Sequence, residues 1–251
     1  MMSSFNLLKG KTALITGSNR GIGKAIAEAF AMNGADIIAC FREETNESKE
    51  LIDLFTEKYS VKIRPLYFDL ANENEIKDAL RILIDERSRV DILVNNAGIA
   101  HGGFLQMTPI SRIKEVFEIN FFAQLVIIQT ISRIMMRQRS GSIINMASVT
   151  ALDSYQGYTA YGSSKAALIS VTKTLSCELA PYNIRINAIA PGLTETDMAD
   201  QMEQKARQEI IDNSTMKRMA SSVEVANMAL FLASDLSSFV NGQVLRVDGG
   251  M

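Results

Sequence analysis

The sequence predicts an α/β fold in which a parallel sheet is covered by helices on both faces. Short apolar runs alternate with segments of helical periodicity along the chain, and runs that are apolar throughout are typical of strands buried on both faces. The 251 residues suffice for one large domain, and no linker, internal repeat or low-complexity tract divides them. We therefore expect residues 1–251 to form one domain.

Composition excludes several classes of function. The net charge of -2 and the pI near 5.6 provide no basic surface for nucleic acid or anionic membrane. The amino terminus lacks signal-peptide features and no eighteen apolar residues run together, so we expect a cytoplasmic protein without a membrane span. His101 is the sole histidine, and Cys40 and Cys177 lack a C-x-x-C spacing. These counts argue against a metal site and predict two buried free thiols.

The first strand is expected at 12–16, and a glycine-rich turn follows it. Apolar residues then recur at helical spacing until Gly34 ends the helix. Glycines let a backbone approach a ligand closely, and the N–H groups at a helix start attract a pyrophosphate. The turn therefore predicts a dinucleotide-binding loop, with a plain tight turn as the alternative. Its residues are Gly17, Ser18, Asn19, Arg20, Gly21, Ile22 and Gly23.

The second strand, at 36–41, is followed by Arg42 instead of a carboxylate, and a polar helix comes next at 46–59. In sites that bind NAD, an acidic residue near this position holds the ribose 2′-hydroxyl, whereas arginine suits the 2′-phosphate of NADP. Together with Arg20 in the glycine-rich turn, Arg42 predicts NADP(H) as the cofactor. The alternative for either arginine is a solvated side chain.

The third strand is expected at 61–68, and Pro65 inside it predicts an edge or irregular strand because proline lacks an N–H group. Asp69 and Leu70 follow at the carboxyl end of the strand. We expect Asp69 to accept a hydrogen bond from the adenine amino group of the cofactor. The alternative is that Asp69 caps the helix expected at 72–87.

A fourth strand at 92–94 is followed by Asn95, Asn96, Ala97 and Gly98. Small residues and side-chain amides after a strand let a loop pass close to a cofactor while they satisfy buried backbone groups. We expect Asn96, Ala97 and Gly98 to contact the cofactor, and loop rigidity is their second role.

Two later segments, 117–136 and 166–179, are apolar around most of a helix circumference. One face of each can pack on the sheet, and the other faces also need cover. We predict a subunit interface from these two helices, with complete burial in one chain as the alternative. Asn120 lies in the first of them, where a polar amide requires a partner.

The chemistry is expected where an apolar strand at 143–147 ends in Ser148, and where Tyr161 and Lys165 open a helix. Residues four apart share a helix face, which brings an ammonium group near a phenol. A nearby cation stabilises the phenolate and lowers the pKa of tyrosine below about 10. Tyr161 would then exchange a proton with a carbonyl oxygen whose carbon receives a hydride, while Ser148 holds that oxygen. The alternative is an exposed helical pair.

The same alternation continues through a strand at 184–190, a helix at 222–233 and a strand at 243–247. Between the first two, residues 198–213 carry methionines and isoleucines among charged residues. Such a segment suits a mobile lid over a pocket, and ordinary core packing is the alternative.

Taken together, the motifs occur in the order and at about the spacing of the short-chain dehydrogenase/reductase family, which nearly the whole chain resembles. The resemblance implies a doubly wound, Rossmann-type fold with three layers and a seven-stranded parallel sheet. It also implies a nicotinamide cofactor and a catalytic set of asparagine, serine, tyrosine and lysine. The matching elements are Thr16-Gly17-x-x-x-Gly21-Ile22-Gly23, Asn95-Asn96-Ala97-Gly98, Asn120, Ser148, Tyr161-x-x-x-Lys165 and Pro191-Gly192.

The resemblance further implies roles for single residues. Asn120 would support a water in a proton relay through Lys165, and Lys165 would also bind the nicotinamide ribose. Thr194 and Thr196 would contact the carboxamide and the phosphates. This part of the implied cofactor site comprises Tyr161, Lys165, Pro191, Gly192, Thr194 and Thr196.

Within the family the chain is most similar to the 3-oxoacyl-acyl-carrier-protein reductases, through residues 191–198 and its last five residues. That resemblance implies reduction of 3-oxoacyl thioesters in fatty acid biosynthesis, a homotetramer, and a carrier protein docked on basic residues beside the active site. Arg137 and Arg139 match part of that basic patch, but Tyr182 replaces its second part and the 152–158 loop is bulkier. Alternatives are a reductase or dehydrogenase of another small alcohol, sugar or cyclic ketone, and a non-catalytic NADP(H)-binding sensor.

Overall fold

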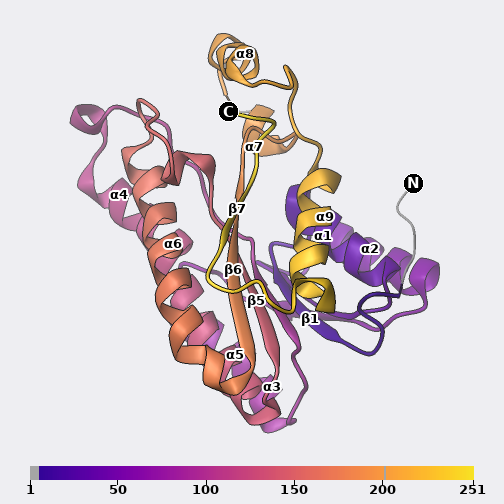
Figure 1. The fold of residues 1–251 in the computed structure, drawn as a ribbon. Helices are drawn as coiled ribbons and strands as arrows, with labels where there is room; N and C mark the ends of the chain where they lie inside the picture. The colour runs from indigo at the N-terminus through magenta and orange to yellow at the C-terminus, as the bar shows by residue number, and fades with distance from the viewer. Residues whose placement is uncertain (1–5, 201) are drawn as a thin grey trace.

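A parallel sheet of seven strands runs through the part of the chain that the computed structural model describes, residues 6–200 and 202–251 (Figure 1). The strand order is β3-β2-β1-β4-β5-β6-β7, which confirms the predicted doubly wound fold. Strand order reverses between β1 and β4, and ligands of such sheets bind at this point, beyond the carboxyl ends of the strands. The strands are β1 (Thr12–Thr16), β2 (Asp36–Phe41), β3 (Ile63–Tyr67), β4 (Ile92–Asn95), β5 (Gly141–Met146), β6 (Ile184–Pro191) and β7 (Val244–Val247).

Helices cover both faces of the sheet, as predicted. On one face α1, α2 and α9 pack around one apolar cluster, and on the other α3, α5 and the end of α6 pack around a second. The α-helices are α1 (Gly21–Met32), α2 (Asn46–Tyr59), α3 (Glu73–Asp85), α4 (Ile110–Phe117), α5 (Ala123–Gln138), α6 (Thr159–Leu179), α7 (Asp197–Asp200), α8 (Gln204–Asn213) and α9 (Ser222–Ala233). Short helical turns are η1 (Leu105–Met107), η2 (Glu118–Phe122), η3 (Val149–Ala151), η4 (Ala180–Tyr182) and η5 (Asp235–Ser237).

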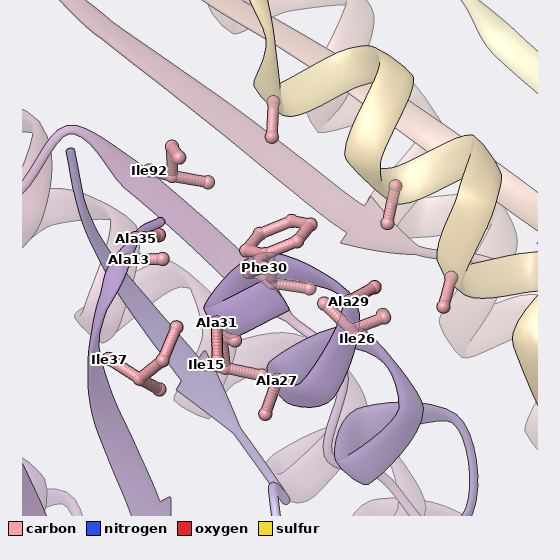
Figure 2. Packing of buried hydrophobic residues seen from close by; sticks show 14 of the residues in the cluster. Ala13, Ile15, Ile26, Ala27, Ala29, Phe30, Ala31, Ala35, Ile37 and Ile92 are labelled. Carbon is pink, nitrogen blue, oxygen red and sulfur yellow. The ribbon is translucent and has the colours of Figure 1, made fainter. Parts of the chain in front are cut away.

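The central strands are apolar throughout because their side chains alternate between two covered faces. In β1, Ile15 belongs to the α1 side of the sheet and its neighbour Leu14 to the α5 side, and both are fully buried. Figure 2 shows Phe30 of α1 close above the sheet near Ile92, among small alanine side chains. Alanines on both helices let α1 and α9 approach each other closely.

Several sequence expectations are refined by the structure. β3 lies at the edge of the sheet, as Pro65 predicted, and it is shorter than expected. The helix expected at 117–136 is interrupted by the π-helical turn η2, which contains Asn120. The prediction of two buried thiols is correct for Cys40 and wrong for Cys177, which lies exposed on α6.

The helical stretch Ile110–Gln138 is long and apolar enough to cross a membrane by length and composition alone. Half of its most apolar window is buried inside the protein. Its buried side packs in the apolar cluster around α3, α5 and the end of α6, whereas Phe122 remains 49% exposed. Complete burial of this helix within one chain, the alternative to an interface, is therefore wrong for Phe122.

Candidate active site

Three of the four predicted catalytic side chains meet beyond the carboxyl end of β5. Ser148 lies two residues after that strand, and Tyr161 and Lys165 lie in the first two turns of α6. The Ser148 side chain acts on the Tyr161 phenol, the pKa of which it lowers. The Lys165 ammonium lies 5.8 Å from the centre of the Tyr161 ring and donates a 2.7 Å hydrogen bond to the Met146 carbonyl. The exposed-pair alternative is wrong, because Lys165 is 4% exposed.

Burial dominates the electrostatics of this group. It raises the pKa of Tyr161 to about 12, although the hydrogen bond with Ser148 acts in the opposite direction. Burial also lowers the pKa of Lys165 to about 8, because the ammonium is removed from water. The sequence-based expectation that Lys165 lowers the phenol pKa is therefore wrong for the chain by itself. The phenol is held in its protonated form, which is the form that donates a proton.

Asn120, the fourth predicted catalytic residue, is fully buried in the π-helical turn. Its Oδ1 accepts from the Ile99 N–H at 2.8 Å, and its Nδ2 donates to the Ile99 carbonyl at 2.9 Å and to Ser164 Oγ at 3.2 Å. Both amide hydrogens are thus used and one lone pair of Oδ1 stays available for a water. A Cβ atom built on Gly98 would lie 2.8 Å from Asn120 Oδ1 and 3.4 Å from Lys165 Nζ, so these two groups flank the same glycine.

The glycine-rich turn has the backbone properties that a pyrophosphate site requires. Gly17 and Gly21 adopt φ of +69° and +52°, and a Cβ on Gly23 would lie 2.1 Å from the Gly17 carbonyl oxygen. The N-cap of α1 is Arg20, which makes no side-chain capping hydrogen bond, and the first turn contains no acidic residue. The N–H groups at the start of α1 are therefore free of a side-chain cap and can bind phosphate oxygens. These features fit a dinucleotide better than a plain tight turn.

Thr16 joins the glycine-rich turn to the loop after β4. Its Oγ1 accepts hydrogen bonds from the Asn96 and Ala97 N–H groups, both at 3.0 Å. The Asn96 side chain in turn donates to the Thr16 carbonyl at 2.9 Å. The structure thus brings Asn96, Ala97 and Gly17 together, as predicted. The sequence motif included Thr16, but nothing in it indicated that this hydroxyl links the two loops.

The two arginines expected at the 2′-phosphate both pair with carboxylates. Arg42 lies 2.7 Å from Asp69 and Arg20 lies 2.8 Å from Asp197, and both arginines are largely exposed. Asp69 also accepts from the Ala71 N–H at 2.9 Å. Asn72 caps α3, so the N-cap alternative for Asp69 is wrong. Asp69 is therefore engaged by Arg42, and Leu70 beside it is half-buried.

The turn after β6 leads back to the glycine-rich turn. Pro191 ends β6, and Thr194 Oγ1 donates to the Gly192 carbonyl at 3.1 Å. A Cβ on Gly21 would lie 3.2 Å from Thr196 Cγ2, so Thr196 faces the start of α1. Thr196 and the start of α1 are thus close together, and their contacts with a cofactor stay a prediction.

A cavity of about 290 Å³ lies between the 152–158 loop and the segment predicted as a lid. That segment forms α7 and α8, and no described residue of α8 is fully buried. Residue 201, inside the predicted lid, lies outside the described residues. The lid's placement over a cavity agrees with the prediction, and its mobility stays a prediction. The cavity lining is Tyr155, Gln156, Tyr158, Met202, Ala206, Glu209, Ile210, Asn213 and Met251.

Comparison with known proteins places this geometry in a family. A family model described as Enoyl-(Acyl carrier protein) reductase matches residues 17–251. The 3-oxoacyl-[acyl-carrier-protein] reductase FabG of Thermotoga maritima is 38% identical over 97% of this chain and 98% of its own length. The chain belongs to the short-chain dehydrogenase/reductase family. It is an oxidoreductase that acts on CH–OH and C=O groups.

Solved structures of this family with quite different substrates are equally similar. The L-sorbose reductase of Gluconobacter frateurii, complexed with NADPH and L-sorbose, has a TM-score of 0.90 and 31% identity, with 98% of each chain covered. A 7α-hydroxysteroid dehydrogenase complexed with NADH and a 7-oxo bile acid conjugate has a TM-score of 0.91 and 32% identity, covering 100% of this chain and 98% of the other. The short-chain dehydrogenase/reductase fold thus leaves the substrate open.

One prediction based on the resemblance is wrong within a single chain. Arg137 and Arg139 lie at the end of α5, just before β5 begins, whereas Ser148 follows the other end of that strand. Arg139 stacks over the Tyr182 ring at 5.6 Å, at the same far end. The basic residues expected beside the active site are therefore separated from it by the length of β5.

Proposed function

We propose that the protein is an NADPH-dependent ketoreductase in which Tyr161 is the acid and base. The observation that carries the proposal is that Ser148, Tyr161 and Lys165 lie together at the same edge of the sheet as an uncapped, glycine-rich helix start. The cofactor is NADP(H), which when bound supplies the hydride. Ser148 holds the substrate oxygen and Tyr161 gives it a proton, while Lys165 and a water on Asn120 resupply that proton.

The residues proposed to hold the cofactor line the carboxyl edge of the sheet. The α1 start binds the pyrophosphate, and Arg42 with Arg20 favours the 2′-phosphate, since no carboxylate occupies the position directly after β2. Lys165 binds the nicotinamide ribose. The full set is Gly17, Ser18, Asn19, Arg20, Gly21, Ile22, Gly23, Arg42, Asp69, Leu70, Asn96, Ala97, Gly98, Tyr161, Lys165, Pro191, Gly192, Thr194 and Thr196.

The favoured substrate is a 3-oxoacyl thioester, which the identity to FabG of Thermotoga maritima supports. The second candidate is a sugar or cyclic ketone, because Gln156, Glu209 and Asn213 bring polar groups to the cavity. A non-catalytic sensor has the least support. Burying the Lys165 ammonium against the Tyr161 phenol is costly, and binding alone would not require it.

The central test is Tyr161→Phe. We expect NADPH binding, measured by its fluorescence, to stay close to wild type, while turnover falls by several orders of magnitude because the proton donor is lost. Wild-type NADPH oxidation is first screened with an acetoacetyl thioester, a ketose and a cyclic ketone. Wild-type turnover in the Tyr161→Phe protein would refute the assigned acid, and no turnover of any ketone by the wild type would favour the sensor.

The cofactor preference is tested by Arg42→Ala, with Arg81→Ala as the matched control because Arg81 also forms an exposed ion pair. Arg42→Ala should weaken NADPH binding about tenfold or more and leave NADH binding nearly unchanged, since only NADPH carries the 2′-phosphate. Titration of both nucleotides measures the two dissociation constants. Equal losses for NADPH and NADH would contradict the phosphate-binding role.

We also propose that 1–251 forms one domain of a cytoplasmic homotetramer that binds neither nucleic acid nor membranes. A tetramer with two-fold axes requires two different self-complementary surfaces. Exposed apolar side chains lie on α4–α5, including Phe122, and separately around α9–η5, including Phe239. Analytical ultracentrifugation should give a wild-type tetramer and a dimer for Phe122→Glu or Phe239→Glu. A monomeric wild type would refute the proposal.

A further inference from the structure

Thr150 hydrogen-bonds twice to the catalytic serine. The Thr150 N–H donates to Ser148 Oγ at 3.2 Å, and the Thr150 hydroxyl donates to the same oxygen at 2.9 Å. A serine oxygen has two lone pairs and one hydrogen. Both lone pairs of Ser148 are thus occupied, and its hydrogen is left to be donated elsewhere.

The hydroxyl bond is not explained by local structure alone. Ser148 is the N-cap of η3, and the backbone N–H of Thr150 already satisfies that capping role. The Thr150 hydroxyl adds a second bond that the cap does not need. The turn is also held against the tyrosine helix, because a Cβ on Gly162 would lie 2.6 Å from the Thr150 carbonyl oxygen. Thr150 is therefore fixed relative to Ser148 and also relative to Tyr161, which precedes Gly162 in α6.

We propose that Thr150 is a positioning residue that makes Ser148 a hydrogen-bond donor toward the substrate oxygen and the Tyr161 hydroxyl. This inference rests on the proposed ketoreductase function. By filling the lone pairs of Ser148, Thr150 prevents that serine from turning its hydrogen back into the protein. A hydroxyl that accepts hydrogen bonds is also a stronger donor, since hydrogen bonds in a chain polarise one another. A stronger donor stabilises the transition state in which negative charge develops on the substrate oxygen.

The test compares Thr150→Val, which removes the hydroxyl and keeps the branched shape and the backbone N–H, with Thr150→Ser, which keeps the hydroxyl. Thr56→Val, on the exposed side of α2, is the matched control. Acetoacetyl-coenzyme A reduction with NADPH and 3-hydroxybutyryl-coenzyme A oxidation with NADP⁺ are followed across pH. We expect kcat of Thr150→Val to fall roughly fivefold to twentyfold, less than the 100-fold to 1,000-fold lost with a direct oxyanion donor. Thr150→Ser should retain at least half of the wild-type kcat.

The pH profile separates positioning from a structural role. A weaker donor at Ser148 stabilises the Tyr161 phenolate less, so the pH at which oxidation activates should rise in Thr150→Val and stay at the wild-type value in Thr150→Ser. Wild-type kcat and pH profile in Thr150→Val, or an equal loss in Thr150→Ser, would overturn the inference. If Thr150→Val does not fold, Thr150→Ala replaces it under the same criteria. Tyr161→Phe is measured in parallel: its full activity would refute the proposed function itself, whereas its inactivity beside a normal Thr150→Val refutes only the role of Thr150.

Discussion

Replacing Lys165 by methionine should reveal the cost of its buried charge as a pH-dependent difference in stability. Lys165 is 4% exposed and burial lowers its pKa from 10.5 to about 8. Between these two values the unfolded lysine keeps its proton and the folded one loses it. The unfolded state thus binds more protons, and the free energy of unfolding of the wild type rises with pH across this window.

The size of the effect follows from the two pKa values. Linkage gives a gain of about 2.5 kcal/mol for the wild type between pH 7 and pH 10 from this group. Lys165→Met has no such group, so the difference in unfolding free energy, wild type minus variant, should increase by about that amount. The lost hydrogen bond to the Met146 carbonyl adds a constant penalty of about 1–3 kcal/mol to the variant, which does not affect the slope.

Urea unfolding at pH 7, 8.5 and 10 measures this difference. The window ends at pH 10 because the raised pKa of Tyr161, about 12, makes the folded state lose stability as pH rises above the unfolded value of about 10. Lys24→Met, which removes an exposed lysine from α1, controls for the loss of a positive charge. A wild-type-minus-Lys165→Met difference that stays constant from pH 7 to pH 10 would refute the argument that burial controls this site.

Three further changes test other parts of the site. Gly23→Ala should lower the free energy of unfolding by about 2–3 kcal/mol and weaken NADPH binding, because the new Cβ would lie 2.1 Å from the Gly17 carbonyl oxygen. Wild-type stability of this variant in urea unfolding would contradict this packing. Asn120→Leu should cost about 2 kcal/mol by leaving two backbone groups without partners, and a loss below about 0.5 kcal/mol would show that the amide bonds are dispensable. Arg246→Gln should raise KM for the ketone severalfold with less than about 1 kcal/mol of destabilisation, because Arg246 holds Asp153 of the 152–158 loop at 2.7 Å. Steady-state kinetics of Asp153→Asn should show the same KM change, and an unchanged KM in both would exclude this contact from substrate binding.

Local chemistry was enough to predict the sheet. Continuous apolar strands, the glycines at a strand-to-helix turn and the edge position of β3 each follow from a rule about one short segment. Pro65 is the simplest case, since a residue without an N–H group cannot pair on both sides. The Tyr161–Lys165 pairing was likewise predictable, because it depends only on helical spacing.

Contacts that depend on which segments become neighbours could not be predicted from the sequence. Arg42 and Asp69 pair because β2 and β3 lie side by side in parallel register, with Phe41 opposite Tyr67, so both residues follow adjacent strand ends. Helical periodicity gave no sign of the π-helical turn at Asn120, because one extra residue in a turn leaves the apolar pattern almost unchanged. Arg139 was misplaced because the resemblance put it beside the active site, although the strand predicted at 143–147 already separated it from Ser148.

The pKa of Tyr161 was misjudged for a related reason, and the correction bears on the protonation state of the phenol. Spacing indicated that a cation lies near the phenol but not how much water either group loses, and burial is the largest influence on both pKa values. With its pKa raised to about 12, Tyr161 is protonated at pH 7, which is the form that the proposed ketoreductase requires of its acid. The alkoxide formed when a carbonyl accepts a hydride is a stronger base than phenolate, so proton transfer from Tyr161 is downhill despite the raised pKa. In the proposed reaction, oxidation of an alcohol needs the phenolate, so its rate should increase with pH toward the raised pKa of Tyr161.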